Sequence, residues 1–494
     1  MCCRKRCVDY SRVLAGIVLV GSLIASPALA QQSLFSATNA PSDQSLEQQW
    51  QDVLRGEYVT VDFAALRAVA DPALSGDRIV LTLLDGVSVT AAEQRVDWMA
   101  ADRYVWVGTV EGVPGSEVSL ASNRGVLAGE VTLGDQAYQI RPVREGKHLV
   151  FEVDRSAFPE VEDIVLEPAG NAAPPAPRQQ GGSKANLTEN IDLMIVFTDP
   201  ARTQAGGQAA LEAIIMNGVG RMNTATMNSG QTHTFTLVDI REVIYTETGS
   251  STDVQRLQNP SDGHMDEVHT WRDDVGADMV GMVVSTAYPF CGVAFNINDP
   301  LGNPNAAANA FNLTIWNCVD GNRSLAHEFG HNMGMRHDPF VDPTPTPDPY
   351  NHGYTNPVAG NTFRTIMAYN NACSAMGLNC PRMSYWSDPT LTINGDVVGT
   401  VTEEHNARAL DERAAAIAAF RTLVPPGPVT RYVAPMGNDA GNDCTNAGNP
   451  CATVTHAVAQ ALDGDTINIA AGDYDEPAMV IDKELTFEGE GVVY

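Results

Sequence analysis

The chain has 494 residues, of which 44% are apolar and 18% are charged. This composition supports buried cores and excludes a mainly disordered chain, and the length predicts two to four domains. The formal net charge of -30 argues against nucleic acid or anionic membranes as partners bound through a general basic surface.

Residues 1–30 have the pattern of a signal peptide. Three consecutive basic residues begin at Arg4, residues 13–24 form an apolar core, and Ala28 and Ala30 give the small-x-small form of a cleavage site. A membrane anchor is the alternative, but the apolar run is short for a transmembrane span. We therefore predict a secreted, extracellular protein without a transmembrane anchor, with the cell surface as a second location.

Residues 31–167 are expected to form a mostly β domain. They contain no cysteine, and short alternating stretches broken by glycine occur at 104–107, 117–120, 129–133 and 148–153. Residues 168–186 are rich in Pro, Gly, Ala and Gln, which is typical of a linker. A linker in this position is a natural place for proteolytic maturation.

Residues 187–424 alternate between strand-like and helix-like segments. The predicted strands are 191–197, 233–245 and 279–284, and the predicted helices lie around 211–222, 265–275 and 410–420. The Asn-rich stretch 295–312 is expected to be a loop. This order favours an α/β domain with a mostly parallel, twisted sheet and helices packed on it.

Six cysteines remain after residue 30, and an even number in an exported chain predicts disulfides. Six cysteines allow fifteen pairings, and order and domain placement favour Cys291–Cys318, Cys373–Cys380 and Cys444–Cys451. A thiolate metal site is the alternative, but no Cys-x-x-Cys occurs after residue 30.

The most specific pattern in the chain is HEFGHNMGMRHD, residues 327–338. His327 and His331 are four residues apart, so on a helix both imidazoles point to the same side and can meet one ion. Gly334 can adopt a positive φ, end the helix and turn the chain, which brings His337 back as a third ligand. Three neutral nitrogens leave a fourth position for water, as in catalytic Zn²⁺ sites.

Glu328 follows the first histidine and could reach a water molecule on the ion. The predicted roles are Zn²⁺ binding by the three histidines and general base catalysis by Glu328. Together they predict hydrolysis of peptide bonds, with proteins or peptides as substrates. A buried helix with scattered histidines is the alternative, and the fixed spacing disfavours it.

The motif His327-Glu328-x-x-His331-x-x-Gly334-x-x-His337 resembles that of the metzincin zinc endopeptidases. Asp338 is similar to the reprolysin (adamalysin) branch, particularly its bacterial secreted members. The resemblance covers residues 187–424 and implies a metzincin catalytic domain of α/β type. It also implies a Met-turn at residues 365–369, with Met367 as an apolar floor beneath the zinc, and a supporting role for Asp338.

Two further expectations come from this resemblance. Residues 384–389, SYWSDP, resemble the segment that forms a wall of the primed-side specificity pocket, which makes Tyr385 and Trp386 candidate pocket residues. Tyr369 stands two residues after Met367, where the astacin and serralysin branches carry a zinc-binding tyrosine; a packed or hydrogen-bonding tyrosine is the favoured alternative.

The N-terminal region, 31–167, looks like the propeptides of bacterial relatives, which predicts a zymogen. It has no cysteine, so a cysteine switch is not available to it. Inhibition by this region would therefore act sterically or through a carboxylate.

Residues 425–430 are predicted to be a second linker, and residues 431–494 are rich in Gly, Asn and Asp, with short strand-like stretches such as 466–469. This last segment resembles the start of secreted parallel β-helix domains. A few coils cannot bury their own apolar face, so we expect the chain to continue past Tyr494 or the segment to dock on its neighbour. The competing function is a surface adhesin or binding protein in which the β-helix is the functional part.

A calcium site is the remaining prediction. Asp342 and Asp348 lie in the acidic loop 338–350 and could bind Ca²⁺. The loop has no EF-hand pattern, and its proline content favours a plain extended loop.

Overall fold

The computed structural model describes residues 33–489 except 72–76, 159–160, 168–188, 298–305, 347, 422–426, 440–441 and a few single positions after residue 462. The predicted signal peptide and the predicted linker 168–186 lie outside the described residues. Within the described part of the chain, no helix is long and apolar enough to cross a membrane.

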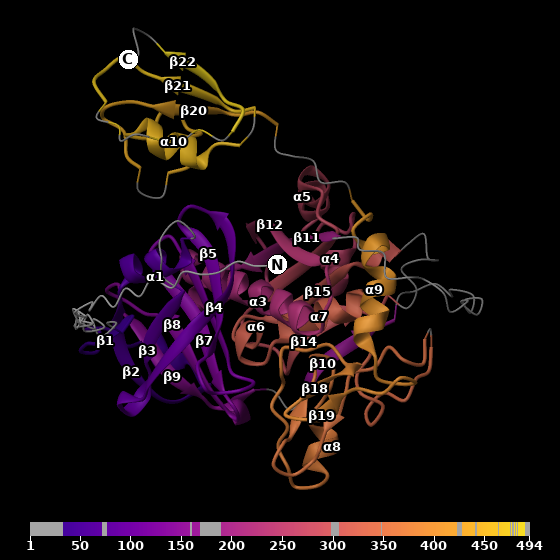
Figure 1. Cartoon of the computed structure of the whole chain (residues 1–494). Coiled ribbons are helices and arrows are strands. Elements are labelled where there is room, and N and C mark those ends of the chain that lie inside the picture. The colour runs from indigo at the N-terminus through magenta and orange to yellow at the C-terminus, as the bar shows by residue number, and fades with distance from the viewer. Residues whose placement is uncertain are drawn as a thin grey trace, which may run out of the picture. The chain divides into compact units, whose positions relative to one another are not determined.

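The N-terminal region forms a nine-stranded sheet with the order β1-β2-β9-β8-β7-β6-β5-β4-β3 (Figure 1). Its strands are β1 (Phe35–Ala37), β2 (Val53–Val61), β3 (Arg78–Thr82), β4 (Ser88–Ala100), β5 (Arg103–Val110), β6 (Glu117–Asn123), β7 (Val126–Leu133), β8 (Gln136–Pro142) and β9 (His148–Val153). All neighbours are antiparallel. The mostly β character expected from the sequence is confirmed.

Strand β5 shows why this sheet is covered on both faces. Tyr104 and Trp106 enter the core of the N-terminal domain, where helix α1 (Phe63–Ala70) also packs. Val105 and Val107 point to the opposite face and contact Met216 of the following domain. The apolar residues on both faces therefore join the two domains.

The second domain is built on a six-stranded sheet with the order β10-β14-β15-β13-β11-β12 (Figure 1). Its strands are β10 (Val161–Leu166), β11 (Asn190–Thr198), β12 (Thr234–Val243), β13 (Met279–Val284), β14 (Phe290–Phe295) and β15 (Phe311–Ile315). Strands β12, β11, β13 and β15 are parallel, as expected from the alternation of strands and helices. Strand β14 runs antiparallel to β15, so the sheet is mixed.

The structure adds two strands that the sequence did not predict. The stretch 295–312 is not all loop, because β15 begins at Phe311 and lies buried between β13 and β14. Asn312 interrupts the apolar pattern by which a buried strand is recognised. Its buried side-chain amide donates to Asn332 Oδ1 at 2.9 Å. Strand β10, within the predicted N-terminal domain, pairs in parallel with β14, which would otherwise be the unpaired edge of the sheet.

The helices of this domain are α2 (Asp199–Gln204), α3 (Gln208–Asn228), α4 (Thr252–Gln258), α5 (Glu267–Val275), α6 (Cys318–Gly321), α7 (Ser324–Asn332), α8 (Asn371–Ser374) and α9 (Asn406–Ile417). Helix α3 is buried almost all round because it also packs against the N-terminal sheet. Gly220 permits this approach, since a Cβ there would overlap Val105.

The two domains share an apolar core. Trp50, Leu149 and Phe151 of the N-terminal domain belong to the same cluster of buried residues as β11 and β13. The rings of Trp50 and Trp316 are 6.1 Å apart, and Trp50 Nε1 donates to the carbonyl of Gln204 at 3.0 Å. The interface between the domains is therefore packed like the interior of one domain.

The remaining elements are small. Two antiparallel pairs and a C-terminal segment follow: β16 (Thr355–Asn356), β17 (Phe363–Arg364), β18 (Asp388–Ile393), β19 (Asp396–Val398), β20 (Thr430–Val433), α10 (Val454–Gln460), β21 (Thr466–Ile469) and β22 (Thr486–Gly489). Strands β20, β21 and β22 pair in parallel. This register fits coils of a β-helix, and the β-helix assignment stays a prediction.

All three favoured disulfides are confirmed. Cys291 bonds to Cys318, Cys373 to Cys380 and Cys444 to Cys451. The first of them ties β14 to the start of α6.

Candidate metal centre

Helix α7 places His327 and His331 one turn apart with their rings facing the same point. His327 Nδ1 lies 2.8 Å from the carbonyl oxygen of Ile366, and His331 Nδ1 lies 2.9 Å from that of Met335. A carbonyl oxygen only accepts, so each Nδ1 carries the proton and each Nε2 presents a lone pair. Burial lowers the pKa of His327 to about 3 and also lowers the pKa of His331, which keeps both rings neutral.

The chain turn after α7 adds the third ring. Gly334 has a φ of 78°, and a Cβ there would also overlap the guanidinium of Arg413, so only glycine fits. His337 then places its Nε2 3.2 Å from that of His327 and 3.0 Å from that of His331. His327 and His331 Nε2 are 3.2 Å apart.

This geometry fits a metal ion. Lone pairs that face one another at such distances repel unless a cation lies between them. Two ligands of a tetrahedral Zn²⁺ ion are expected about 3.3 Å apart, given bonds of about 2.0 Å. The predicted ligands His327, His331 and His337 thus converge as the sequence suggested.

A carboxylate completes the group. Asp163 of β10 has its Oδ2 3.0 Å from His331 Nε2 and 3.2 Å from His337 Nε2, and the four ligand atoms lie within 4.8 Å of one another. Asp163 is at the site because β10 pairs with β14.

Tyr369 reaches the centre through Asp163. Its hydroxyl donates to Asp163 Oδ1, and its ring centroid is 4.4 Å from that of His337. The backbone N–H of Tyr369 donates to Asp338 Oδ2 at 2.8 Å. Through this hydrogen bond Asp338 holds the backbone beside the site and does not orient a histidine ring. Burial raises the pKa of Asp338 to about 6.

Glu328 is fully buried on α7 beside the histidines. Its carboxylate lies against Gly292 of β14, where any Cβ would overlap it. The side chain is thus confined between the helix and the strand that pairs with β10.

Met367 lies under α7, where a Cβ on Gly330 would overlap its sulfur. This position agrees with the apolar floor expected for a Met-turn. Of the two candidate pocket residues, Trp386 is fully buried and donates from Nε1 to Thr226 Oγ1 at 3.2 Å, so it belongs to the core. Tyr385 is only partly buried, and its pKa is raised by burial and by Glu117 of the N-terminal domain.

The two aspartates of the predicted calcium site point to separate arginines. Arg336 Nη1 donates to Asp342 Oδ2 at 3.0 Å, and Arg413 Nη2 donates to Asp348 Oδ2 at 2.7 Å. These ion pairs account for both carboxylates, and the calcium site stays a prediction.

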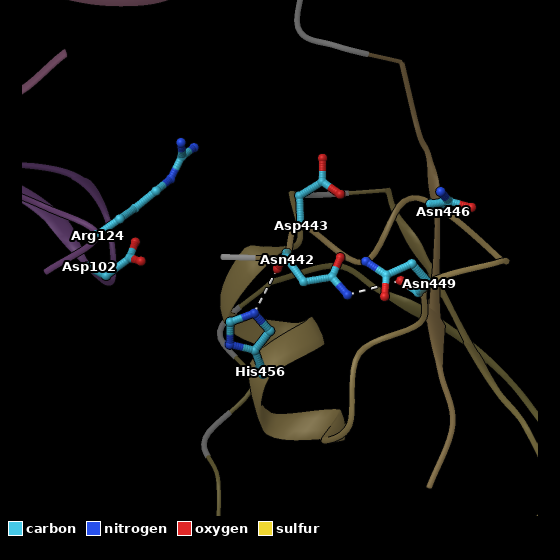
Figure 2. Close-up of a pocket in the computed structure, with 7 residues that line it drawn as sticks. All are labelled: Asp102, Arg124, Asn442, Asp443, Asn446, Asn449 and His456. Atoms are coloured by element: carbon cyan, nitrogen blue, oxygen red, sulfur yellow. Dashed lines mark hydrogen bonds between the residues drawn. The ribbon is translucent and has the colours of Figure 1, made fainter. Parts of the chain in front are cut away.

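Another group of potential ligands among the described residues is Cys444, Cys451 and His456. Its two sulfurs form a disulfide, and His456 Nε2 lies 2.8 Å from the Asn442 carbonyl (Figure 2). This group therefore stabilises the C-terminal segment and offers no thiolate.

Three acidic residues near the metal centre were not identified from the sequence: Asp163, Glu117 and Glu130. Glu117 pairs with Thr132, and Glu130 with Ser119, across β6 and β7. Polar residues at alternating positions of two neighbouring strands were the available signal, because they form a polar face that another element must cover. No local signal marked Asp163.

Comparisons with known proteins agree with this site. Residues 187–387 match the model of metallopeptidase family M12. A peptidyl-Asp metalloendopeptidase of Xanthomonas campestris is 31% identical over 434 residues, which cover 84% of this chain and 96% of the relative. Two relatives of the same name from Stenotrophomonas maltophilia are 32% identical over 74% of this chain and 86% of the relative, and 29% identical over 83% and 97%.

The comparisons favour an enzyme over the alternative of a surface adhesin. The three disulfides are consistent with an extracellular protein. M12 metallopeptidases are zinc-dependent, and the histidine-rich group supplies a metal site of suitable chemistry. The chain belongs to metallopeptidase family M12 and is a metalloendopeptidase.

Proposed function

We propose that this chain is a secreted zinc endopeptidase of the metzincin type, made as a latent precursor. His327, His331 and His337 hold Zn²⁺, and Glu328 is the general base. The observation that carries the proposal is the convergence of three histidine Nε2 atoms within 3.2 Å of one another. The predicted signal peptide and the disulfides support secretion.

The ion and the protein would contribute different parts of the hydrolysis reaction. Zinc in this site would lower the pKa of a water molecule toward about 7 and polarise the scissile carbonyl. Glu328 takes the proton of the attacking water and passes it to the leaving amine. Gly292 leaves the space in which the Glu328 carboxylate lies, and Met367 supports α7 from below.

The N-terminal region keeps the precursor inactive in this proposal. Asp163 supplies the fourth ligand atom of the group, beside the three histidine nitrogens. In a catalytic zinc site, water occupies this fourth ligand position. Strand β10 covers the free edge of β14, the strand whose face packs against Glu328. Tyr369 has a hydrogen-bonding role here, because its hydroxyl holds Asp163.

The substrate class follows from the relatives. They are named peptidyl-Asp metalloendopeptidases, so we infer cleavage of peptide bonds next to an aspartyl residue.

The test is Glu328→Gln in the processed enzyme. Because the amide cannot take a proton, peptide cleavage should fall by about 10²- to 10⁴-fold while the zinc content stays at one ion per chain. Zinc is measured by elemental analysis and cleavage with a peptide library. Glu267→Gln, at the exposed start of α5, is the matched control and should change neither. Cleavage by Glu328→Gln at the wild-type rate would refute the mechanism.

A further inference from the structure

Two buried arginines of the catalytic domain hold an acidic side chain that belongs to the N-terminal domain. Arg221 of α3 has its Nη1 2.7 Å from Glu130 Oε1, and Arg323 Nη2 lies 3.7 Å from the same oxygen. The three residues are each at most 2% exposed. Glu117 adds a second carboxylate, 3.2 Å from Arg221 Nε.

One arginine of the pair, Arg323, is close to the metal ligands along the chain. Arg323 is four residues before His327, so it is one helical turn from the first ligand, and His327 N–H donates to its carbonyl at 3.2 Å. Arg323 Nε donates to Ser384 Oγ at 3.0 Å, in the segment that resembles a pocket wall. Arg382, in the same stretch, is close enough to act electrostatically on His327.

The N-terminal domain and the metal centre are connected along the same side. Phe158, five residues before Asp163, packs against Gly321 of α6, where a Cβ would overlap its ring. The segment that reaches the metal ligands with Asp163 therefore begins at α6, two residues before Arg323.

The charges of this cluster do not balance without the N-terminal domain. Asp320 of α6 faces Arg221, but burial raises the pKa of Asp320 to about 7. A single carboxylate also cannot balance the positive charges of both Arg221 and Arg323. Burial and the neighbouring Arg221 lower the pKa of Arg323 to about 9. Removal of Glu117 and Glu130 would leave a positive site that favours another carboxylate.

We propose that Arg221 and Arg323 form the pocket that receives the aspartyl side chain of the substrate, and that Glu130 occupies this pocket in the precursor. Arg323 provides the contact nearest to the metal ligands, and Arg221 the second positive charge. The inference rests on the proposed function and adds the residues that determine its substrate class.

A purely structural ion cluster is the competing explanation. Such a cluster would stabilise the precursor but would not discriminate between substrates. The two explanations therefore differ in the ratio of kcat/KM for an aspartyl peptide and for the same peptide with Asn in its place, since Asn keeps the shape and removes the charge.

The experiment measures this ratio in the processed enzyme obtained from the full-length chain. Wild type should prefer Asp by about 100-fold, and Arg323→Gln should lower the preference to below about 5-fold, because the pocket loses the charge that distinguishes Asp from Asn. Arg323→Lys keeps the charge, so its preference for the Asp peptide should stay within about 10-fold of the wild-type preference. Arg202→Gln, a partly exposed arginine of α2, is the matched control.

An unchanged preference in Arg323→Gln overturns the pocket assignment and leaves the zinc mechanism standing. If that variant does not fold, Arg221→Gln is measured in its place, and a preference equal to wild type has the same meaning. A wild-type enzyme that holds zinc but cleaves neither peptide overturns the proposed function and this inference with it.

Discussion

Asp163 is the residue of the N-terminal region that reaches the metal centre. Its carboxylate oxygens lie 3.0 Å from His331 Nε2 and 3.1 Å from His337 Nε2, and Tyr369 holds it in place. The histidines have their own backbone partners at Ile366 and Met335. Loss of the Asp163 side chain should therefore open the fourth position without displacing the first two ligands.

We expect the full-length Asp163→Ala precursor to cleave peptides at least about 10-fold faster than the wild-type precursor. The visible absorption of the cobalt-substituted precursor should also change, because water replaces a carboxylate as the fourth ligand. Asp77→Ala, at an exposed aspartate of the N-terminal domain, serves as the control. An identical cobalt spectrum and an equally inactive precursor would show that Asp163 is not a ligand.

Local sequence was sufficient for the residues of the zinc motif but not for their partners. His327, Glu328, His331, Gly334 and His337 lie within eleven residues, where one helix and the turn at Gly334 fix their relations. Asp163 reaches the site across 164 residues through strand pairing. Register between distant strands depends on tertiary packing, so this contact could not be predicted from the sequence.

Strand β14 is the element that organises the catalytic side of the sheet. It pairs with β15 on one side and β10 on the other, and its Gly292 faces Glu328. Continuous apolar runs predicted β11 and β13, apolar residues at helical spacing predicted α3, and the spacing of the histidines predicted α7. These patterns failed for β15, whose buried Asn312 breaks the apolar pattern and is satisfied only by the distant Asn332.

Gly292→Ala should impair catalysis through this strand. The added methyl group overlaps the Glu328 carboxylate, so the base must move, and kcat should fall by about 10- to 100-fold with zinc retained. The readouts are kcat of the processed enzyme and its zinc content. Gly427→Ala adds a Cβ that meets no atom within 4 Å and should leave both unchanged. A normal kcat in Gly292→Ala would mean that Glu328 is not confined by β14.

At the scale of the whole molecule, the N-terminal and catalytic domains are held together by apolar contacts and buried ion pairs. Glu130 is the central acid: burial would raise its pKa, but Arg221 and Arg323 lower it from its ordinary 4.5 to about 2. Gln139 donates to it as well, and Arg155 adds positive charge. An acid whose pKa is lower in the folded state stabilises that state above its ordinary pKa, and the contribution is lost as pH falls toward the folded value.

The precursor should therefore lose stability between about pH 4.5 and pH 2, with about 3 kcal/mol due to Glu130. In urea unfolding, the difference between wild type and Glu130→Gln should be largest near pH 6 and shrink toward pH 2. Glu57→Gln, an exposed glutamate of the same domain, should give a small and constant difference. A difference for Glu130→Gln that does not vary with pH would contradict the assigned ion pairs.

The shared apolar core has a consequence for maturation. A single cut between residues 167 and 189 would leave Trp50 packed against Trp316 and β10 paired with β14, because neither contact depends on chain continuity. The nicked protein would then persist as a two-piece complex that is still inhibited. Activation would require a further step, in which the N-terminal piece is digested or dissociates.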